Sequence, residues 1–184
     1  FLFPQHKVFV NIGGISNIAI HLPEKITAFD VCPGNTLLNF YAQKAGKSFD
    51  ESGNLARKGK VISDLLAQWN EVPFLKAASP KSLGTEHILQ EWISLDSKVD
   101  AQIEDKLTTA VEHIAEQISF IINQINEEIL SNGILITGGG ALSDFLIERI
   151  RSKVKAEILI PDRITIDFKE ALIMAFLGLQ RWLG

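Results

Sequence analysis

Small polar residues surround a Gly-Gly pair near the start of the chain. The run Val-Asn-Ile-Gly-Gly-Ile-Ser-Asn has apolar residues before Gly13 and after Gly14, which predicts two strands joined by a tight turn. A turn without side chains, flanked by Asn11, Ser16 and Asn17, exposes backbone N–H groups that can bind an anion. The alternative is an ordinary tight hairpin with no ligand.

A second glycine run stands between an apolar segment and a helical pattern. Gly138, Gly139 and Gly140 follow the short apolar run 134–137, a position where backbone N–H groups can face a nucleotide. The sequence is not a dinucleotide fingerprint, because its sixth position is Ser143, and no Gly-Lys-Ser/Thr follows to make a Walker loop. Close packing of the helix on the strand is the alternative reading.

Other reactive side chains form no recognisable site. The histidines are His6, His21, His87 and His113, which are too far apart in sequence to have metal-ligand spacing. Cys32 stands at a predicted strand end without a nearby histidine, so we interpret it as a buried or cleft-lining thiol. We therefore expect no protein metal cage.

Composition excludes several classes of protein. The 184 residues carry a net charge of −4 with 46% hydrophobic residues, and no run of Lys or Arg exceeds two, which argues against nucleic acid as a partner. No segment approaches the roughly 18 apolar residues of a membrane span. One cysteine excludes an internal disulfide and favours a reducing cytosol. The start at Phe1 lacks a Met and a signal-peptide pattern, so we expect a piece of a longer protein.

Periodicity predicts the elements that position the two glycine runs. We expect strands at 7–12, 18–22, 25–31, 134–137 and 157–160, and helices beginning with Asn35 as N-cap, at 103–130 and at 141–152. A last helix is capped by Asp167 and buries Phe168, Ala171, Leu172, Ala175, Phe176 and Leu179. Residues 47–102 are read as an insertion of loops with short helices at 61–69 and 85–94. A coiled coil is the alternative for 103–130.

This order of elements predicts the fold class. Three antiparallel strands followed by two strands that alternate with helices make a five-stranded mixed sheet flanked by helices. We expect an α/β fold of the ribonuclease-H-like type, with the helical insertion on one side.

Five motifs in order carry a family resemblance. They are V-N-I-G-G-I-S-N at 10–17, F-D-V-C-P-G-N at 29–35, S-P-K-S-L-G-T-E at 79–86, I-T-G-G-G-A at 136–141 and D-x-x-E-A at 167–171. Together they resemble the anhydro-N-acetylmuramic acid kinases, over the C-terminal half of that family's length. The family belongs to the actin, hexokinase and heat-shock chaperone superfamily, in which two lobes clamp ATP.

The resemblance implies an activity and its ligands. Such kinases use ATP and magnesium to open the 1,6-anhydro ring with water while phosphorylating the 6-oxygen, which yields N-acetylmuramic acid 6-phosphate for cell-wall recycling in the bacterial cytoplasm. The partners it implies are the anhydro-amino-sugar and the missing N-terminal lobe, and a homodimer is left open.

The resemblance also assigns residues to ligands. It implies that nucleotide phosphates bind Asn11, Gly13, Gly14, Ser16 and Asn17, and that the nucleoside lies on 138–140. It implies sugar contacts from Asp30, Asn35, Lys81, Ser82 and the acid Glu170. A helix capping box is the alternative for Asp167 with Glu170, and a solvated loop lysine is the alternative for Lys81.

Departures from the family pattern limit this assignment. Val31-Cys32 and Leu83-Gly84-Thr85 replace the family's usual Thr-Gly and Thr-Gly-Arg, which removes a hydroxyl and a guanidinium from the implied sugar contacts. The family's first phosphate loop and its general base lie upstream of Phe1. Two other functions stay open, namely another kinase of the superfamily and a non-enzymatic actin-like nucleotide-binding module.

Overall fold

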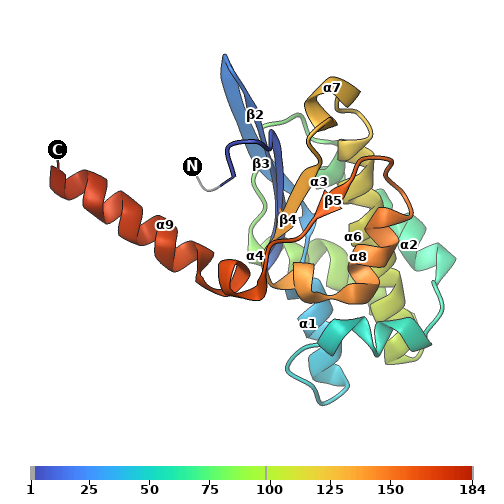
Figure 1. Cartoon of the computed structure of the whole chain (residues 1–184). Coiled ribbons are helices and arrows are strands. Elements are labelled where there is room, and N and C mark those ends of the chain that lie inside the picture. Colours follow the sequence, from blue (N-terminus) through green and yellow to red (C-terminus); the bar gives the residue numbers. More distant parts are fainter. Residues whose placement is uncertain (1–2, 98, 184) are drawn as a thin grey trace.

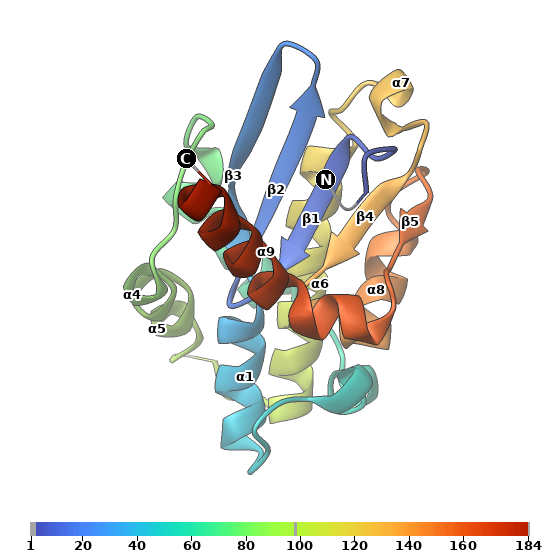
Figure 2. The ribbon, with the colours of Figure 1, turned by 60° about the vertical axis from the view of Figure 1, so that its left-hand side comes forward.

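A five-stranded mixed sheet forms the centre of the molecule (Figures 1 and 2). The computed structural model describes residues 3–97 and 99–183. Its strands are β1 (Val8–Ile12), β2 (Ile15–Leu22), β3 (Lys25–Pro33), β4 (Ile134–Thr137) and β5 (Ile158–Leu159), in the spatial order β3-β2-β1-β4-β5. β1, β2 and β3 pair antiparallel, whereas β4 runs parallel to β1 and β5 parallel to β4. The predicted mixed sheet is confirmed.

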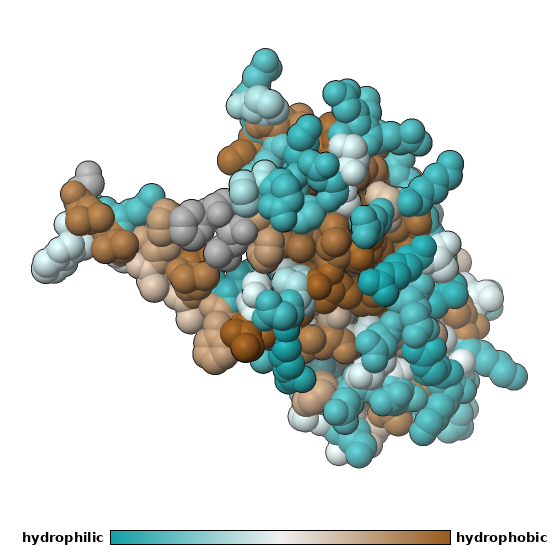
Figure 3. All heavy atoms as spheres, viewed as in Figure 1, coloured by the Kyte–Doolittle hydropathy of each residue, from teal (hydrophilic) through white to brown (hydrophobic). Residues whose placement is uncertain are grey.

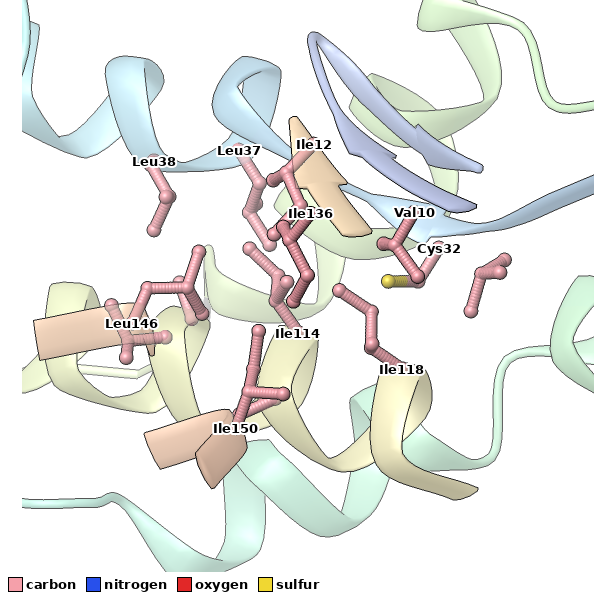
Figure 4. Close-up of a cluster of buried hydrophobic side chains, with 14 of the residues drawn as sticks. Val10, Ile12, Cys32, Leu37, Leu38, Ile114, Ile118, Ile136, Leu146 and Ile150 are labelled. Carbon is pink, nitrogen blue, oxygen red and sulfur yellow. The ribbon is translucent and has the colours of Figure 1, made fainter. Parts of the chain in front are cut away.

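Alternation of side chains decides which face of the sheet enters the core. Val8, Val10 and Ile12 of β1 are buried, while the residues between them face the other side. The helices α1 (Asn35–Lys44), α6 (Ile103–Ile122) and α8 (Asp144–Arg151) cover the buried face. Figure 4 shows their side chains meeting those of the strands, as where Ile114 lies beside Ile136. The opposite face lies towards α9 (Arg163–Leu183).

Short helices fill the segment between α1 and α6. They are η1 (Glu51–Gly53), η2 (Ala56–Lys58), α2 (Ser63–Asn70), α3 (Pro73–Lys76), α4 (Thr85–His87), η3 (Ile88–Ile93) and α5 (Ser94–Asp96). The sequence predicted two helices in this segment, at 61–69 and 85–94, and a loop over the residues of α3. Proline at the first position of α3 suits a helix start, because its missing N–H would have no partner there anyway.

A buried histidine joins this segment to α6. Trp92 Nε1 donates to His113 Nε2 at 2.9 Å, and His113 Nδ1 lies 2.7 Å from Asn70 Oδ1. Nε2 therefore accepts, and Nδ1 carries the proton that is donated to Asn70. Complete burial lowers the pKa of His113 to about 3. The imidazole is a neutral connector between α6 and the packed helices α2 and η3.

The predicted helix at 103–130 is wrong in its length. α6 ends at Ile122, and a separate short helix, α7 (Glu127–Leu130), follows. Asn126 has extended ψ and its side chain accepts a hydrogen bond from Glu128 N at 2.8 Å, so it caps a new helix. The apolar period runs across this break because Ile125 and Ile129 still pack on the core. α6 packs on α1, α2 and α8 rather than in a coiled coil.

Two predictions about the last helix are also wrong. α9 begins at Arg163, after Asp162, whose carboxylate accepts from Thr165 N at 2.9 Å. Asp162 is thus the capping residue, and Asp167 lies inside the helix, where it accepts from Arg163 at 3.3 Å. The predicted inner face is not inside either, because Phe168, Leu172 and Leu179 are among its exposed residues. Figure 1 shows α9 leading away from the body of the molecule.

Within residues 3–97 and 99–183, the helices are all too short or too polar to cross a lipid bilayer.

Candidate functional site

The Gly13-Gly14 hairpin is held by the first turn of α1. Gly13 O accepts from Asn35 N at 2.7 Å, and Gly14 O accepts from Gly34 N at 2.9 Å and Thr36 N at 3.1 Å. In a trans peptide the C=O and the following N–H point in opposite directions. The N–H groups of Gly14 and residue 15 are therefore aimed away from α1. This arrangement suits an anion on the side opposite α1.

Asn35 lies between the two glycine runs rather than capping α1. Gly34 is the N-cap, without a side-chain cap bond, and Asn35 is the first helical residue. A Cβ on Gly34 would lie 2.5 Å from Gly13 O, so only glycine permits this approach. Asn35 Nδ2 donates to Ile12 O at 3.4 Å and would be 3.1 Å from a Cβ on Gly139. The side chain that was predicted to cap a helix bridges the hairpin and the glycine triplet.

The three glycines of the triplet have different roles. Gly138 has φ +84, and a Cβ there would lie 2.6 Å from Ile12 O. A Cβ on Gly140 would lie 2.3 Å from Ile12 Cγ2. Close packing on β1 therefore accounts for Gly138 and Gly140. Gly139 differs, because it borders an open hollow.

This hollow has a volume of about 350 Å³ and lies between α1, η1 and the glycine triplet. Its lining includes Asn35, Leu38, Asn39, Gly139, Leu142 and Ser143. Of these residues, the sequence assigned Gly139 to the nucleoside and Asn35 to the sugar, and it did not single out Leu38 or Asn39. The helical period was a usable signal, because residues 35, 38 and 39 share one face of α1.

The polar residues of the hairpin point to opposite faces of the sheet. Ser16 is fully buried and its Oγ donates to Pro33 O at 3.4 Å, so its hydroxyl is turned into the fold. Asn11 and Asn17 pair across β1 and β2 and face α9. They border a space of about 590 Å³ between the sheet and α9, lined also by Phe9, Ala19, Leu135, Leu172 and Ile173, which we call the α9 groove.

A lysine that sequence reasoning missed enters the α9 groove. Lys169 Nζ donates to Asn11 Oδ1 at 2.6 Å and to Thr137 Oγ1 at 2.9 Å. The side chain is half-buried, and burial lowers the pKa of its ammonium. A single lysine in a helical pattern has no local signal of such contacts. Its neighbour Glu170 is exposed on α9.

The predicted sugar-binding residues of β3 and the 79–86 loop have partners within the protein. Asp30 accepts from Leu83 N at 2.8 Å and from Ser82 Oγ at 3.2 Å, so the structure brings Asp30 and Ser82 together. Lys81 Nζ donates instead to Phe74 O at 2.9 Å and to the next carbonyl at 2.8 Å, at the end of α3. Burial lowers the pKa of Lys81. Lys81 is therefore not a solvated loop lysine, because its ammonium binds the two carbonyls of α3 rather than the carboxylate of Asp30.

Neither a reactive thiol nor an acidic metal cage lies near the glycine runs. Cys32 is fully buried, and burial raises the pKa of its thiol to about 12, which matches the interpretation of a buried thiol. In the part of the chain that the structure describes, no three His, Cys, Asp or Glu side chains come together to hold a metal ion.

Comparison with known proteins decides between the candidate families. The sequence model of the anhydro-N-acetylmuramic acid kinases matches residues 3–183, nearly the whole chain. The chain belongs to this family. A kinase of the family from Pasteurella multocida is 35% identical over 184 residues, covering 96% of this chain and 48% of that protein. One from Hahella chejuensis is 34% identical, covering 97% and 49%. The chain thus spans about half the length of the curated relatives it matches.

Solved structures show how the fold of this kinase-family chain relates to others. Component A of (R)-2-hydroxyglutaryl-CoA dehydratase from Acidaminococcus fermentans is similar with a TM-score of 0.56 at 16% identity, covering 91% of this chain and 59% of that one. The activator of 2-hydroxyisocaproyl-CoA dehydratase from Clostridium difficile, with bound ADPNP, has a TM-score of 0.52 at 18% identity, covering 86% and 55%. The α/β fold of the chain, with its five-stranded mixed sheet, therefore resembles the folds of these two proteins.

Proposed function

We propose that this chain is the nucleotide-holding lobe of a two-lobe anhydro-N-acetylmuramic acid kinase. The whole protein would add water across the 1,6-anhydro bond and transfer the terminal phosphoryl group of ATP to the sugar 6-oxygen, in the bacterial cytoplasm. One observation carries the proposal. The hairpin, Asn35 and Gly139 meet where β1 and β4 end, beside a hollow of about 350 Å³. Family membership supplies the sugar and the reaction.

The hollow and the hairpin suit different parts of ATP. The nucleoside would lie in the hollow against Gly139 and the face of α1, with Asn35 and Asn39 as polar contacts. The phosphates would lie against the N–H groups that the hairpin aims away from α1. The activator from Clostridium difficile, which shares the fold, was solved with ADPNP, and this supports a nucleotide as a ligand of this fold.

The described residues include no acidic cluster for magnesium. Mg²⁺ is commonly held by the substrate's phosphates and few protein carboxylates, so we propose that the nucleotide carries the ion here. The ion would neutralise charge on the transferred group.

The sugar side would be formed by β3, the 79–86 loop and α9. Asp30 fixes the loop through Leu83 N and Ser82, so it acts by positioning. Lys81 holds the end of α3 and would shape the same loop. Glu170, which is exposed on α9, would contact the sugar, as the family resemblance implies. We propose that the general base belongs to the other half of the protein.

A kinase assay on the full-length gene product tests this function. The protein is incubated with ATP, Mg²⁺ and anhydro-N-acetylmuramic acid, and mass spectrometry follows the 6-phosphate product. Gly139→Val is the negative control, because its side chain would enter the hollow. We expect product from the parent protein and a large loss from the variant. ATP binding without any sugar product would instead favour a non-enzymatic nucleotide-binding module, and phosphorylation of a different sugar would favour another kinase.

A further inference from the structure

One wall of the hollow beside Gly139 is a short segment with a strained backbone. Residues 49–53, which include η1, line this hollow together with Ser143 at the start of α8, and we call them the η1 wall. Ser52 in the wall has φ +54, a left-handed conformation that residues other than glycine rarely adopt. Such strain persists only where surrounding contacts hold it, and it is common at ligand sites. The contacts that hold the η1 wall are therefore informative.

Two sets of contacts shape the wall itself. The carboxylate of Asp50 accepts from Leu55 N at 2.8 Å and from Ala56 N at 2.9 Å, which closes the turn between η1 and η2. A Cβ on Gly53 would lie 2.7 Å from Phe145 Cβ, so the backbone of the wall packs directly on α8. The first set fixes the turn, but the second is only a close approach and supplies no directional bond to α8.

Arg57, one residue beyond this turn, supplies the bond to α8. Its two terminal nitrogens donate to the two carboxylate oxygens of Glu148, each at 2.7 Å. Its Cζ also lies 4.9 Å from the centre of the Phe145 ring, within the range of a cation–π contact. Phe145 and Glu148 are three positions apart and share one face of α8. Arg57 therefore fastens the turn to the helix face on which Gly53 packs.

The exposure of this ion pair indicates a local role. The side chains of Arg57 and Glu148 are 44% and 54% exposed, and ion pairs at such exposure contribute little to the stability of a whole domain. The space-filling view shows a mainly hydrophilic surface around α8 and the segment before α2, in contrast to the apolar side chains along the projecting α9 (Figure 3). Local opening of a short segment is more sensitive to a single contact than global unfolding is.

We propose that Arg57 is a positioning residue for the nucleotide, an inference that rests on the proposed function. Its pair with Glu148 holds the η1 wall against α8 and keeps the hollow in the shape that takes the nucleoside. Phe49, which is 59% exposed at the rim of the hollow, belongs to the same wall. The apparent affinity for a ligand falls in proportion to the fraction of molecules in the binding-competent state. A loosened wall therefore weakens ATP binding and leaves the phosphoryl transfer itself unchanged.

Charge reversal in the full-length protein tests this role. Arg57→Glu and Glu148→Arg are made singly and together, and calorimetric titration measures ATP affinity. We expect each single variant to bind ATP roughly fivefold more weakly, because both break the pair. The double variant restores opposite charges and should recover part of the loss. Recovery is incomplete because Asp144, which attracts the Arg57 guanidinium, would repel a carboxylate at that position.

A matched control and a kinetic readout separate positioning from a general structural effect. Lys76→Glu breaks another exposed ion pair, with Glu71, whose side chains are 61% and 72% exposed and which does not line the hollow. This variant should bind ATP as the parent does. In the kinase assay, Arg57→Glu should raise KM for ATP by the same factor as it weakens binding, with kcat and KM for the sugar unchanged. A partly unfolded enzyme would instead lose kcat.

Three results would overturn the inference. These are single variants that bind ATP as tightly as the parent, a double variant that recovers nothing, and an equal loss of affinity in Lys76→Glu. The parent protein separates this inference from the proposed function. A parent that binds no ATP rejects the proposed function and the role of Arg57 with it. Unchanged ATP affinity of the single variants in an active kinase rejects only the role of Arg57.

Discussion

Lys169 on α9 donates to Asn11 Oδ1 at 2.6 Å and thereby ties the last helix to the strand that leads into the glycine hairpin. Asn11 itself lies between the two glycine runs: its Nδ2 is 3.3 Å from a Cβ position on Gly13, and its Oδ1 is 2.9 Å from one on Gly138. The lysine therefore orients a side chain that touches both loops of the proposed nucleotide site.

Lys169→Met keeps the length of this side chain but removes its donor. A hydrogen bond from a charged group contributes about 1.5 to 3 kcal/mol, so we expect ATP affinity to fall by roughly tenfold if Asn11 loses its position. The free energy of unfolding should fall as well, by up to about 1.5 to 3 kcal/mol, because Met fills the apolar α9 groove but makes neither hydrogen bond of Lys169. Calorimetric titration with ATP measures the affinity. Lys25→Met, at the exposed start of β3, is the control, and equal affinities in both variants would contradict the positioning role.

The glycine triplet yields a pair of matched variants. Gly140→Ala places a methyl group 2.3 Å from Ile12 Cγ2, and such overpacking lowers the free energy of unfolding by about 1 to 3 kcal/mol. Gly139→Ala meets only the end of Asn35 and should leave stability nearly unchanged while weakening ATP binding. Thermal unfolding and ATP titration are measured for both. If Gly139→Ala loses stability and keeps ATP affinity, Gly139 serves packing alone.

The buried His113 predicts how stability depends on pH. Its pKa is about 3 in the folded protein and 6.5 in the unfolded chain, so between these values the unfolded state binds the extra proton. The stabilisation is complete above pH 6.5 and is lost as pH falls towards 3. From pH 7 to pH 5 the free energy of unfolding should fall by about 2 kcal/mol from this group. Protonating Nε2 would also break its bond from Trp92.

Urea unfolding of the parent protein and of His113→Gln, at pH 7 and pH 5, checks this expectation. The variant should be less stable at pH 7 but should lose less stability on acidification. An equal loss in the two proteins would assign the acid sensitivity to other groups. Glu112 is the first of these to consider, because Arg149 and Lys153 lower the pKa of its carboxyl group.

Local patterns were sufficient to predict the sheet but not what covers each surface. The alternation of apolar and polar residues around Gly13 and Gly14 predicts the antiparallel strands, and a short apolar run predicts β4. Both patterns lie within a few neighbouring residues of the sequence. The apolar period of α9 correctly indicated residues on a common face. It did not indicate whether the rest of this chain buries that face, and Phe168 is exposed.

Long-range contacts explain the site residues that were missed or misread. Lys169 bonds to Asn11, 158 positions away, and no spacing rule connects the two residues. Asn35 resembles a helix cap in sequence, but hairpin carbonyls already accept the first N–H groups of α1. The side chain of Asn35 is therefore free to lie between the two glycine runs. Asp30 and Ser82 were each assigned to the sugar without a predicted contact between them, and the 79–86 loop brings Ser82 to Asp30.

We expect this chain to hold nucleotide but to need the other half of the protein for catalysis. The 184-residue chain is purified, its fold is checked by circular dichroism, and it is assayed with ATP, Mg²⁺ and anhydro-N-acetylmuramic acid, alone and after addition of the other half as a separate polypeptide. We predict no N-acetylmuramic acid 6-phosphate from the chain alone, because one lobe neither excludes water nor supplies the general base, and product from the mixture. Product from the chain alone would contradict the two-lobe account and would direct the search for a base to Asp30 and Glu170.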